Sequence, residues 1–184
     1  MQKGAASRES AFIGYTELKE KGCVLTTSYG KINIKFLSNV APETVAAVHA
    51  LAADISACQS CKFYRNEAVP PEGTFGPPYG LLQGSLQGMQ ETPPAEGGSP
   101  AKRGQVCMIP RTQEFFIALV DHDEWGAAHT VWGEVAPADM ESTVRKIVEQ
   151  PFHTVKHPEY GTIMRMLDAE VPFTISLAGR TTTA

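Results

Sequence analysis

The chain has 184 residues, of which 42% are apolar and 20% charged, and its formal net charge is −4. This composition is typical of one globular domain with a sizeable core and excludes a disordered chain. The absence of a Lys/Arg-rich stripe argues against nucleic-acid binding, which needs cations to neutralise phosphates. No apolar run reaches the roughly 20 residues that cross a bilayer, so we expect no membrane contact.

Residues 1–20 contain no hydrophobic segment like that of a secretory signal. We interpret them as an N-terminal extension, residues 21–179 as the folded domain and residues 180–184 as a frayed tail. We expect a cytoplasmic protein if the chain is complete. The alternative location is the lumen of the secretory pathway, which applies if an upstream signal or anchor has been removed from the chain.

A β-hairpin is predicted by residues 23–28 and 31–36, which flank Tyr29-Gly30, because apolar and polar residues alternate in the second segment with the period of a strand. A helix should then run from Pro42 to about Asp54, because proline suits the first helical turn. Its apolar side is expected to comprise Val45, Val48, Leu51, Ala52 and Ile55.

Residues 61–66 are short and aromatic and predict a strand, in which Arg65 should point to the face opposite Tyr64. The long stretch 67–104 is rich in proline and glycine, so most of it should be loop. Only residues 81–83 within it have the character of a strand. A loop region of this length in a compact domain is usually functional or mobile.

The remaining elements are a strand at 105–109 that Pro110 ends, a pair of strands at 115–119 and 130–132, a helix from Pro137, and last strands at 163–167 and 171–177. The buried side of that second helix should comprise Met140, Val144, Ile147 and Val148. About eight short strands with turn signals between them predict a mainly β fold, a closed antiparallel barrel capped by two helices.

Four cysteines are too few for a disulfide scaffold in a chain of this length. Cys58 and Cys61 have the CxxC spacing, but they follow a helix instead of beginning one, which disfavours redox catalysis. The interpretation that we favour is that the cysteines are buried free thiols. A disulfide that joins one of this pair to Cys107 or Cys23 is the next alternative, and it would imply an oxidising compartment.

The connection between the strands at 115–119 and 130–132 holds acidic, histidine and tryptophan residues. Asp121, His122, Asp123 and His129 have ligand chemistry for a metal ion, although a solvated acidic loop would have the same composition. We favour the solvated loop, and expect no metal and no cofactor.

The order of several short motifs resembles the cyclophilin family of peptidyl-prolyl cis-trans isomerases. Thr27-Ser-Tyr-Gly30 and Ala41-Pro42-Glu43-Thr44 are similar to the family's opening hairpin and first helix. Phe63-Tyr64-Arg65 is similar to its Phe-His-Arg strand, and Leu82-Gln83-Gly84 to its Ile-Gln-Gly segment. The set is completed by Phe115-Phe116-Ile117 and His129-Thr-Val-Trp132-Gly133.

The resemblance implies roles for individual residues. Arg65 would be catalytic, since its guanidinium can donate a hydrogen bond to the X-Pro amide as resonance is lost. The substrate, a proline-containing peptide or protein, would be bound by a monomer. Its contacts would be Phe63, Leu81, Gln83, Ile109, Phe116, Trp125 and His129.

The chain also departs from the family pattern. Gly80 stands where an aromatic residue is usual, and Ile109-Pro110 replaces an Ala-Asn pair whose asparagine binds the peptide. Glu114 replaces a glutamine and could pair with Arg65 and block it. We therefore expect an isomerase of weak or narrow activity that assists folding or switching of proline-containing proteins. The alternative is a catalytically inactive, cyclophilin-like binding module.

Overall fold

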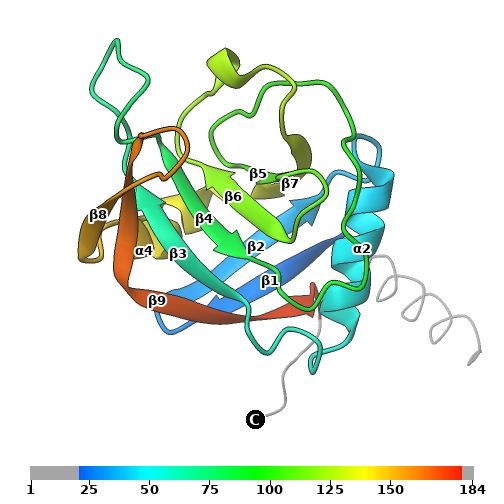
Figure 1. Ribbon diagram of the computed structural model, residues 1–184. Coiled ribbons are helices and arrows are strands. Elements are labelled where there is room, and N and C mark those ends of the chain that lie inside the picture. Colours follow the sequence, from blue (N-terminus) through cyan, green and yellow to red (C-terminus); the bar gives the residue numbers. More distant parts are fainter. Residues whose placement is uncertain (1–20, 180–184) are drawn as a thin grey trace, which may run out of the picture.

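The computed structural model describes residues 21–179, and the extension and tail expected at 1–20 and 180–184 lie outside the described residues. Nine strands form one antiparallel sheet (Figure 1). In chain order they are β1 (Gly22–Thr27), β2 (Gly30–Phe36), β3 (Lys62–Glu67), β4 (Leu81–Ser85), β5 (Gln105–Met108), β6 (Glu114–Ala118), β7 (Thr130–Val135), β8 (Phe152–Lys156) and β9 (Ile163–Leu177).

Eight of these strands close into a barrel in the order β1-β2-β7-β5-β6-β4-β3-β9, because β9 pairs back onto β1. The predicted closed antiparallel barrel is thus confirmed. Its interior holds a continuous apolar core that includes Phe63, Phe115, Trp132 and Phe173. The first three of these come from β3, β6 and β7, so the strands of the barrel wall also supply the side chains of its core.

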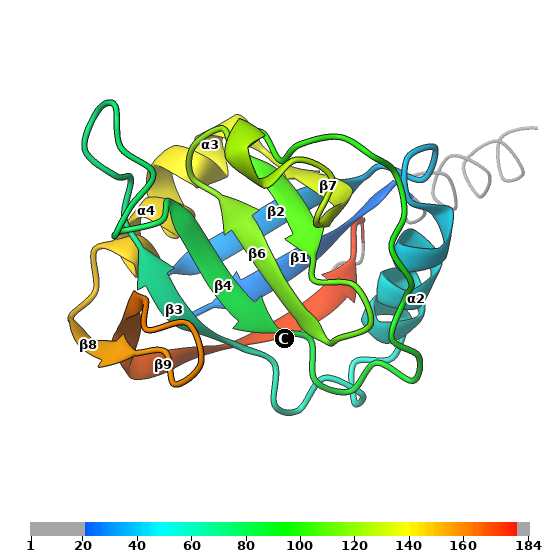
Figure 2. The ribbon, with the colours of Figure 1, turned by 45° about the horizontal axis from the view of Figure 1, so that its top comes forward.

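Two helical segments flank the barrel on opposite sides (Figure 2). The helix α2 (Pro42–Ala53) buries Val45, Val48 and Leu51 against the barrel core, but Ile55 is exposed, so the predicted apolar side ends one turn earlier. The second segment runs without a break through α3 (Pro137–Asp139), a π-helical turn η2 (Met140–Val144) and α4 (Arg145–Val148). No helix within residues 21–179 has the length and apolar character needed to span a bilayer.

The sequence did not predict β8. Its five side chains are all exposed, so no hydrophobic alternation marks it as a strand. It pairs only with the first third of β9, residues 163–167. β9 continues as one strand through Pro172 instead of breaking into the two strands expected. The resulting hairpin stands outside the closed barrel beside β3 (Figure 1).

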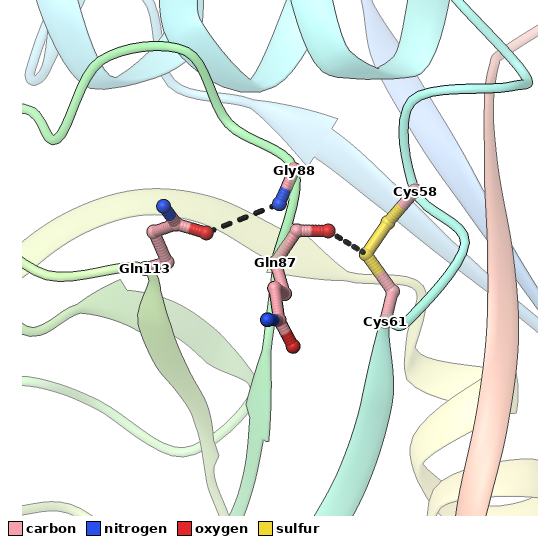
Figure 3. Close-up of a disulfide and its surroundings, with 5 residues drawn as sticks. All are labelled: Cys58, Cys61, Gln87, Gly88 and Gln113. Atoms are coloured by element: carbon pink, nitrogen blue, oxygen red, sulfur yellow. Dashed lines mark hydrogen bonds between the residues drawn. A yellow bond between two sulfur atoms is a disulfide. The ribbon is translucent and has the colours of Figure 1, made fainter.

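A disulfide joins Cys58 to Cys61 in the turn that links α2 to β3 (Figure 3). The Gln87 carbonyl oxygen lies 3.6 Å from Cys61 Sγ, so the turn packs on the chain that follows β4. Cys23 and Cys107 are free and buried, and burial raises the pKa of both thiols. The expectation of buried thiols is thus confirmed for Cys23 and Cys107 and was wrong for Cys58 and Cys61. The alternative bridge to Cys107 or Cys23 was also wrong, because the two cysteines of the CxxC pair bind each other.

Candidate active site

Arg65 lies on β3 with its guanidinium held from two sides. Its Nε donates to Glu67 Oε1 at 3.0 Å, and its Nη1 donates to Gln83 Oε1 at 3.2 Å. Gln83 faces Arg65 across the β3–β4 pair, so the backbone register brings the two side chains together. The Arg65 side chain is 18% exposed, so its partners do not enclose it completely.

Tyr64 also reaches Gln83, although a regular strand would turn it to the opposite face. The register of β3 against both of its neighbours shifts between Phe63 and Arg65, which is a β-bulge. A bulge adds one residue to a strand and re-aims its side chains. Gln83 Nε2 accordingly donates to Tyr64 Oη at 2.8 Å, and the expectation that Arg65 and Tyr64 face apart was wrong.

Glu114 accepts a hydrogen bond from the Tyr64 hydroxyl at 2.5 Å. The predicted pairing of Glu114 with Arg65 does not form, since Arg65 is bound to Glu67 instead. Burial, together with the hydrogen bond to Glu114 and its negative charge, raises the pKa of the Tyr64 phenol. The phenol therefore stays protonated and orders the Gln83 amide beside Arg65.

A second apolar cluster lies on the other side of the sheet from the barrel core. It is built around Phe116, whose ring meets Trp125 edge-on at 5.7 Å between centroids and His129 at 4.9 Å. Edge-to-face pairs of this kind stabilise aromatic clusters beyond their buried area. The cluster comprises Leu37, Tyr79, Leu81, Ala101, Cys107, Ile109, Phe116, Ala118, Trp125 and Val131.

The floor of this cluster is nearly closed. Phe116 is 2% exposed and Leu81 is 5% exposed. The partly exposed rings of Trp125 and His129 lie against Phe116. A proline ring would reach most of Phe116 only after one of these two side chains turned aside. The structure therefore shows an aromatic site with its floor covered.

The pKa of His129 is lowered from its ordinary value, first by burial and then by repulsion from His122. The imidazole that packs on Phe116 is thus neutral near pH 7, which keeps this part of the site apolar.

Phe63 does not belong to the site. It is 0% exposed and packs inside the barrel against Phe115 and Phe173, with ring centroids 5.6 and 5.0 Å away. A side chain enclosed on that face cannot touch a bound peptide. The expectation that Phe63 binds substrate is corrected accordingly, and Phe63 is a core residue.

Tyr79 is a site residue that the sequence analysis missed. It packs against the cluster around Phe116, and its ring centroid is 5.8 Å from Arg65 Cζ. It therefore supplies an aromatic side chain next to the position where the family pattern has one. The usual position is closed to a side chain here, because Gly80 has φ +66° and a Cβ on it would lie 2.5 Å from Val120 Cγ1.

His122 supports the loop that carries Trp125. Its ring is buried and stacks on the Trp125 ring at 3.6 Å between centroids, and its Nε2 lies 2.9 Å from the Gly80 carbonyl oxygen. Lys102 pairs with Asp123. Within residues 21–179 no three His, Cys, Asp or Glu side chains are grouped as metal ligands, so the metal alternative at this connection has no support.

Apart from Phe63, the structure brings together the site residues that were predicted from the sequence. Arg65 and Gln83 form the polar part, and the apolar part comprises Leu81, Ile109, Phe116, Trp125 and His129. Glu67, Tyr64 and Tyr79 join them through the contacts above. Glu67 had no signal in the sequence, because a glutamate at the end of a strand is usually solvated.

A closed antiparallel barrel that places an arginine beside an aromatic floor on its outer face defines a cyclophilin-like domain. Solved cyclophilin structures share this fold. A cyclophilin type peptidyl-prolyl cis-trans isomerase of Cryptosporidium parvum superposes with a TM-score of 0.57 at 14% identity, over 88% of this chain and 99% of its own. A second structure of that protein, in the presence of the dipeptide Ala-Pro, gives a TM-score of 0.55 at 15% identity over 85% and 98% of the two chains.

A cyclophilin from Hirschia baltica gives a TM-score of 0.50 at 12% identity, over 83% of this chain and 73% of its own. No curated protein matches the sequence significantly. The family model described as cyclophilin type peptidyl-prolyl cis-trans isomerase/CLD matches residues 23–171. The chain therefore belongs to the cyclophilin-type peptidyl-prolyl isomerase family.

Proposed function

We propose that the chain is a working peptidyl-prolyl cis-trans isomerase of weak or narrow specificity, which assists folding or conformational switching of proline-containing proteins. The observation that carries the proposal is the placement of the Arg65 guanidinium, anchored by Gln83, beside the aromatic cluster around Phe116. Family membership and the Ala-Pro dipeptide used with the related isomerase support a proline-containing ligand.

The chemistry requires rotation about an X-Pro amide, whose barrier of about 18–20 kcal/mol arises from the partial double bond. No covalent step is needed. A donor placed at the amide lowers the barrier because charge on the amide redistributes as resonance is lost, and a preorganised charge-assisted donor binds that state more strongly than the ground state. Arg65 would be this donor, while Phe116, Trp125 and His129 would hold the proline ring.

The test is exchange spectroscopy by NMR on a short Ala-Pro peptide with the purified chain. We expect faster cis-trans exchange than in buffer, and loss of most of that acceleration in Arg65→Ala. Arg145→Ala is the matched control, since Arg145 is exposed and pairs with Glu149 on α4. An unchanged rate with the wild-type chain, or an Arg65→Ala rate equal to wild type, would refute the proposal.

A non-catalytic binding module is the second candidate, favoured by the covered floor at Phe116. Titration with the same peptide separates the two. Chemical-shift changes at Gln83 and Trp125 without faster exchange would support binding alone, whereas no shift changes in either region would count against both candidates.

A further inference from the structure

Glu67 is a carboxylate enclosed by the site. It ends β3 two residues after Arg65, and its side chain is 0% exposed. Removing a charge from water is costly, and such a group persists in a protein only where charged or N–H partners surround it. The hydrogen-bond partners of Glu67 therefore identify the segments that this carboxylate stabilises.

Three N–H donors from three segments converge on the Glu67 carboxylate. Arg65 Nε binds Oε1 at 3.0 Å, the Arg165 backbone N–H on β9 binds Oε1 at 2.9 Å, and the Tyr79 backbone N–H binds Oε2 at 3.2 Å. One side chain thus links β3, β9 and the end of the Pro-rich loop before β4. The proposed donor and the aromatic residue beside it share this single acceptor.

The contact also sets the direction of the Arg65 fork. Nε is held by Glu67 and Nη1 by Gln83, so two of the three guanidinium nitrogens are anchored. In the part of the chain that the structure describes, Nη2 makes no hydrogen bond to protein. A planar fork fixed at two corners presents its third nitrogen in one orientation, which is the preorganisation that donation to a developing charge requires.

Tyr79 depends on the same carboxylate. Its backbone N–H is bound by Glu67 while its ring lies 5.8 Å from Arg65 Cζ, at the edge of the cluster around Phe116. Because a Cβ at Gly80 would lie 2.5 Å from Val120 Cγ1, the neighbouring Tyr79 supplies the aromatic ring at this end of the loop. Loss of the Glu67 charge would release the donor and this aromatic ring together.

We propose that Glu67 is the positioning residue of the site, which orients the Arg65 guanidinium for donation and fixes Tyr79 beside it. The inference rests on the proposed isomerase function. It predicts that Glu67 acts through Arg65, so its removal should matter only while Arg65 is present.

The experiment is a double-substitution cycle with cis-trans exchange as the readout. Glu67→Gln should lower kcat/KM by roughly ten- to a hundredfold, mainly through kcat, because misplacement of a donor weakens the transition state more than the ground state. In the Arg65→Ala chain the same Glu67→Gln change should have less than about a twofold effect. Glu170→Gln is the matched control. Glu170 is an exposed carboxylate on β9 that pairs with Lys62, which lies on the same strand as Glu67.

Full activity in Glu67→Gln, or independent losses from the two substitutions, would overturn the inference. A direct measurement on the wild-type chain keeps it testable if Glu67→Gln fails to fold or if the chain has no isomerase activity. The Arg65 Nε–H should give a discrete NMR signal that exchanges slowly with water, whereas an exposed Arg145 should not. A rapidly exchanging Arg65 Nε–H would contradict the positioning role by itself, and an absent exchange acceleration would contradict only the isomerase.

Discussion

Gln83 on β4 and Phe116 on β6 are direct register partners in the barrel wall. Gln83 also binds Arg65 and Tyr64, so one pair of opposing residues joins the polar network to the aromatic floor. Directly opposite residues of an antiparallel pair project to the same face. The two halves of the site are therefore held at a fixed separation by the sheet itself.

Tyr64→Phe tests the polar half. The substitution removes the hydroxyl that accepts from Gln83 and donates to Glu114. We expect a loss of about 1–2 kcal/mol in the free energy of unfolding, and a several-fold slower isomerisation because the Gln83 amide loses its second anchor. Urea unfolding and peptide exchange measure the two effects. Tyr160→Phe, on a largely exposed tyrosine, should change neither, and equal losses from the two variants would contradict this prediction.

Gly80→Ala tests whether an aromatic could be restored at this position. Positive φ costs an L residue about 1–2 kcal/mol, and the added Cβ would also press on Val120 Cγ1 at 2.5 Å. Gly73→Ala is the matched control, since Gly73 has φ +76° but has no atoms within 4 Å of such a Cβ. We expect Gly80→Ala to cost about 1–3 kcal/mol more than Gly73→Ala in thermal or urea unfolding. Equal costs would show that the contact with Val120 is absent.

His129 should make the stability of the chain fall in mild acid. Its pKa is lowered in the folded state, so below the ordinary value of 6.5 the unfolded chain takes up a proton that the folded chain does not. The free energy of unfolding therefore falls as the pH drops from about 6.5 towards the lowered pKa. His129→Gln should flatten this part of a stability–pH curve measured by urea unfolding. An unaltered curve would refute the assignment.

The Cys58–Cys61 disulfide should add modestly to stability, because the loop that it closes is short. The chain-entropy relation gives about 2 kcal/mol for so short a loop. For a chain of this size that loss lowers Tm by roughly 4–8 °C. The double variant Cys58→Ser/Cys61→Ser should show this lower Tm in a melting scan. A reductant should lower the Tm of the wild type and leave that of the double variant unchanged. A reductant effect in the double variant would place the sensitivity elsewhere.

Arg111→Gly probes the turn that follows Ile109-Pro110 and leads into β6. Arg111 is a non-glycine residue with φ +62°, and its N–H binds the Pro93 carbonyl oxygen. Glycine adopts this conformation without the steric cost but loses more entropy on folding. We expect a change in stability between zero and a gain of about 1 kcal/mol. A decrease in the free energy of unfolding would contradict this prediction and would mean that the Arg111 side chain itself stabilises the turn.

Local sequence patterns were sufficient for the barrel strands, and the resemblance in motif order supplied the candidate site residues. Period-two alternation identified the strand at residues 31–36, and short runs rich in aromatic and aliphatic residues identified the segments that carry Arg65, Gln83 and Phe116. The ordered motifs then identified the family. Where burial is missing, as in the fully exposed β8, the same signal vanishes and the strand was not predicted.

Only the tertiary structure decided how these residues interact. The bulge at Tyr64 re-aimed one side chain, and the Pro-rich loop brought Tyr79 onto a glutamate twelve positions earlier in the chain. Glu67 reads as an ordinary surface charge until β9 and that loop enclose it. The sequence by itself determined a cyclophilin-type barrel with an arginine and an aromatic floor. The fold alone determined that Glu67, and not Glu114, holds the arginine, because pairing between distant segments sets which charges meet.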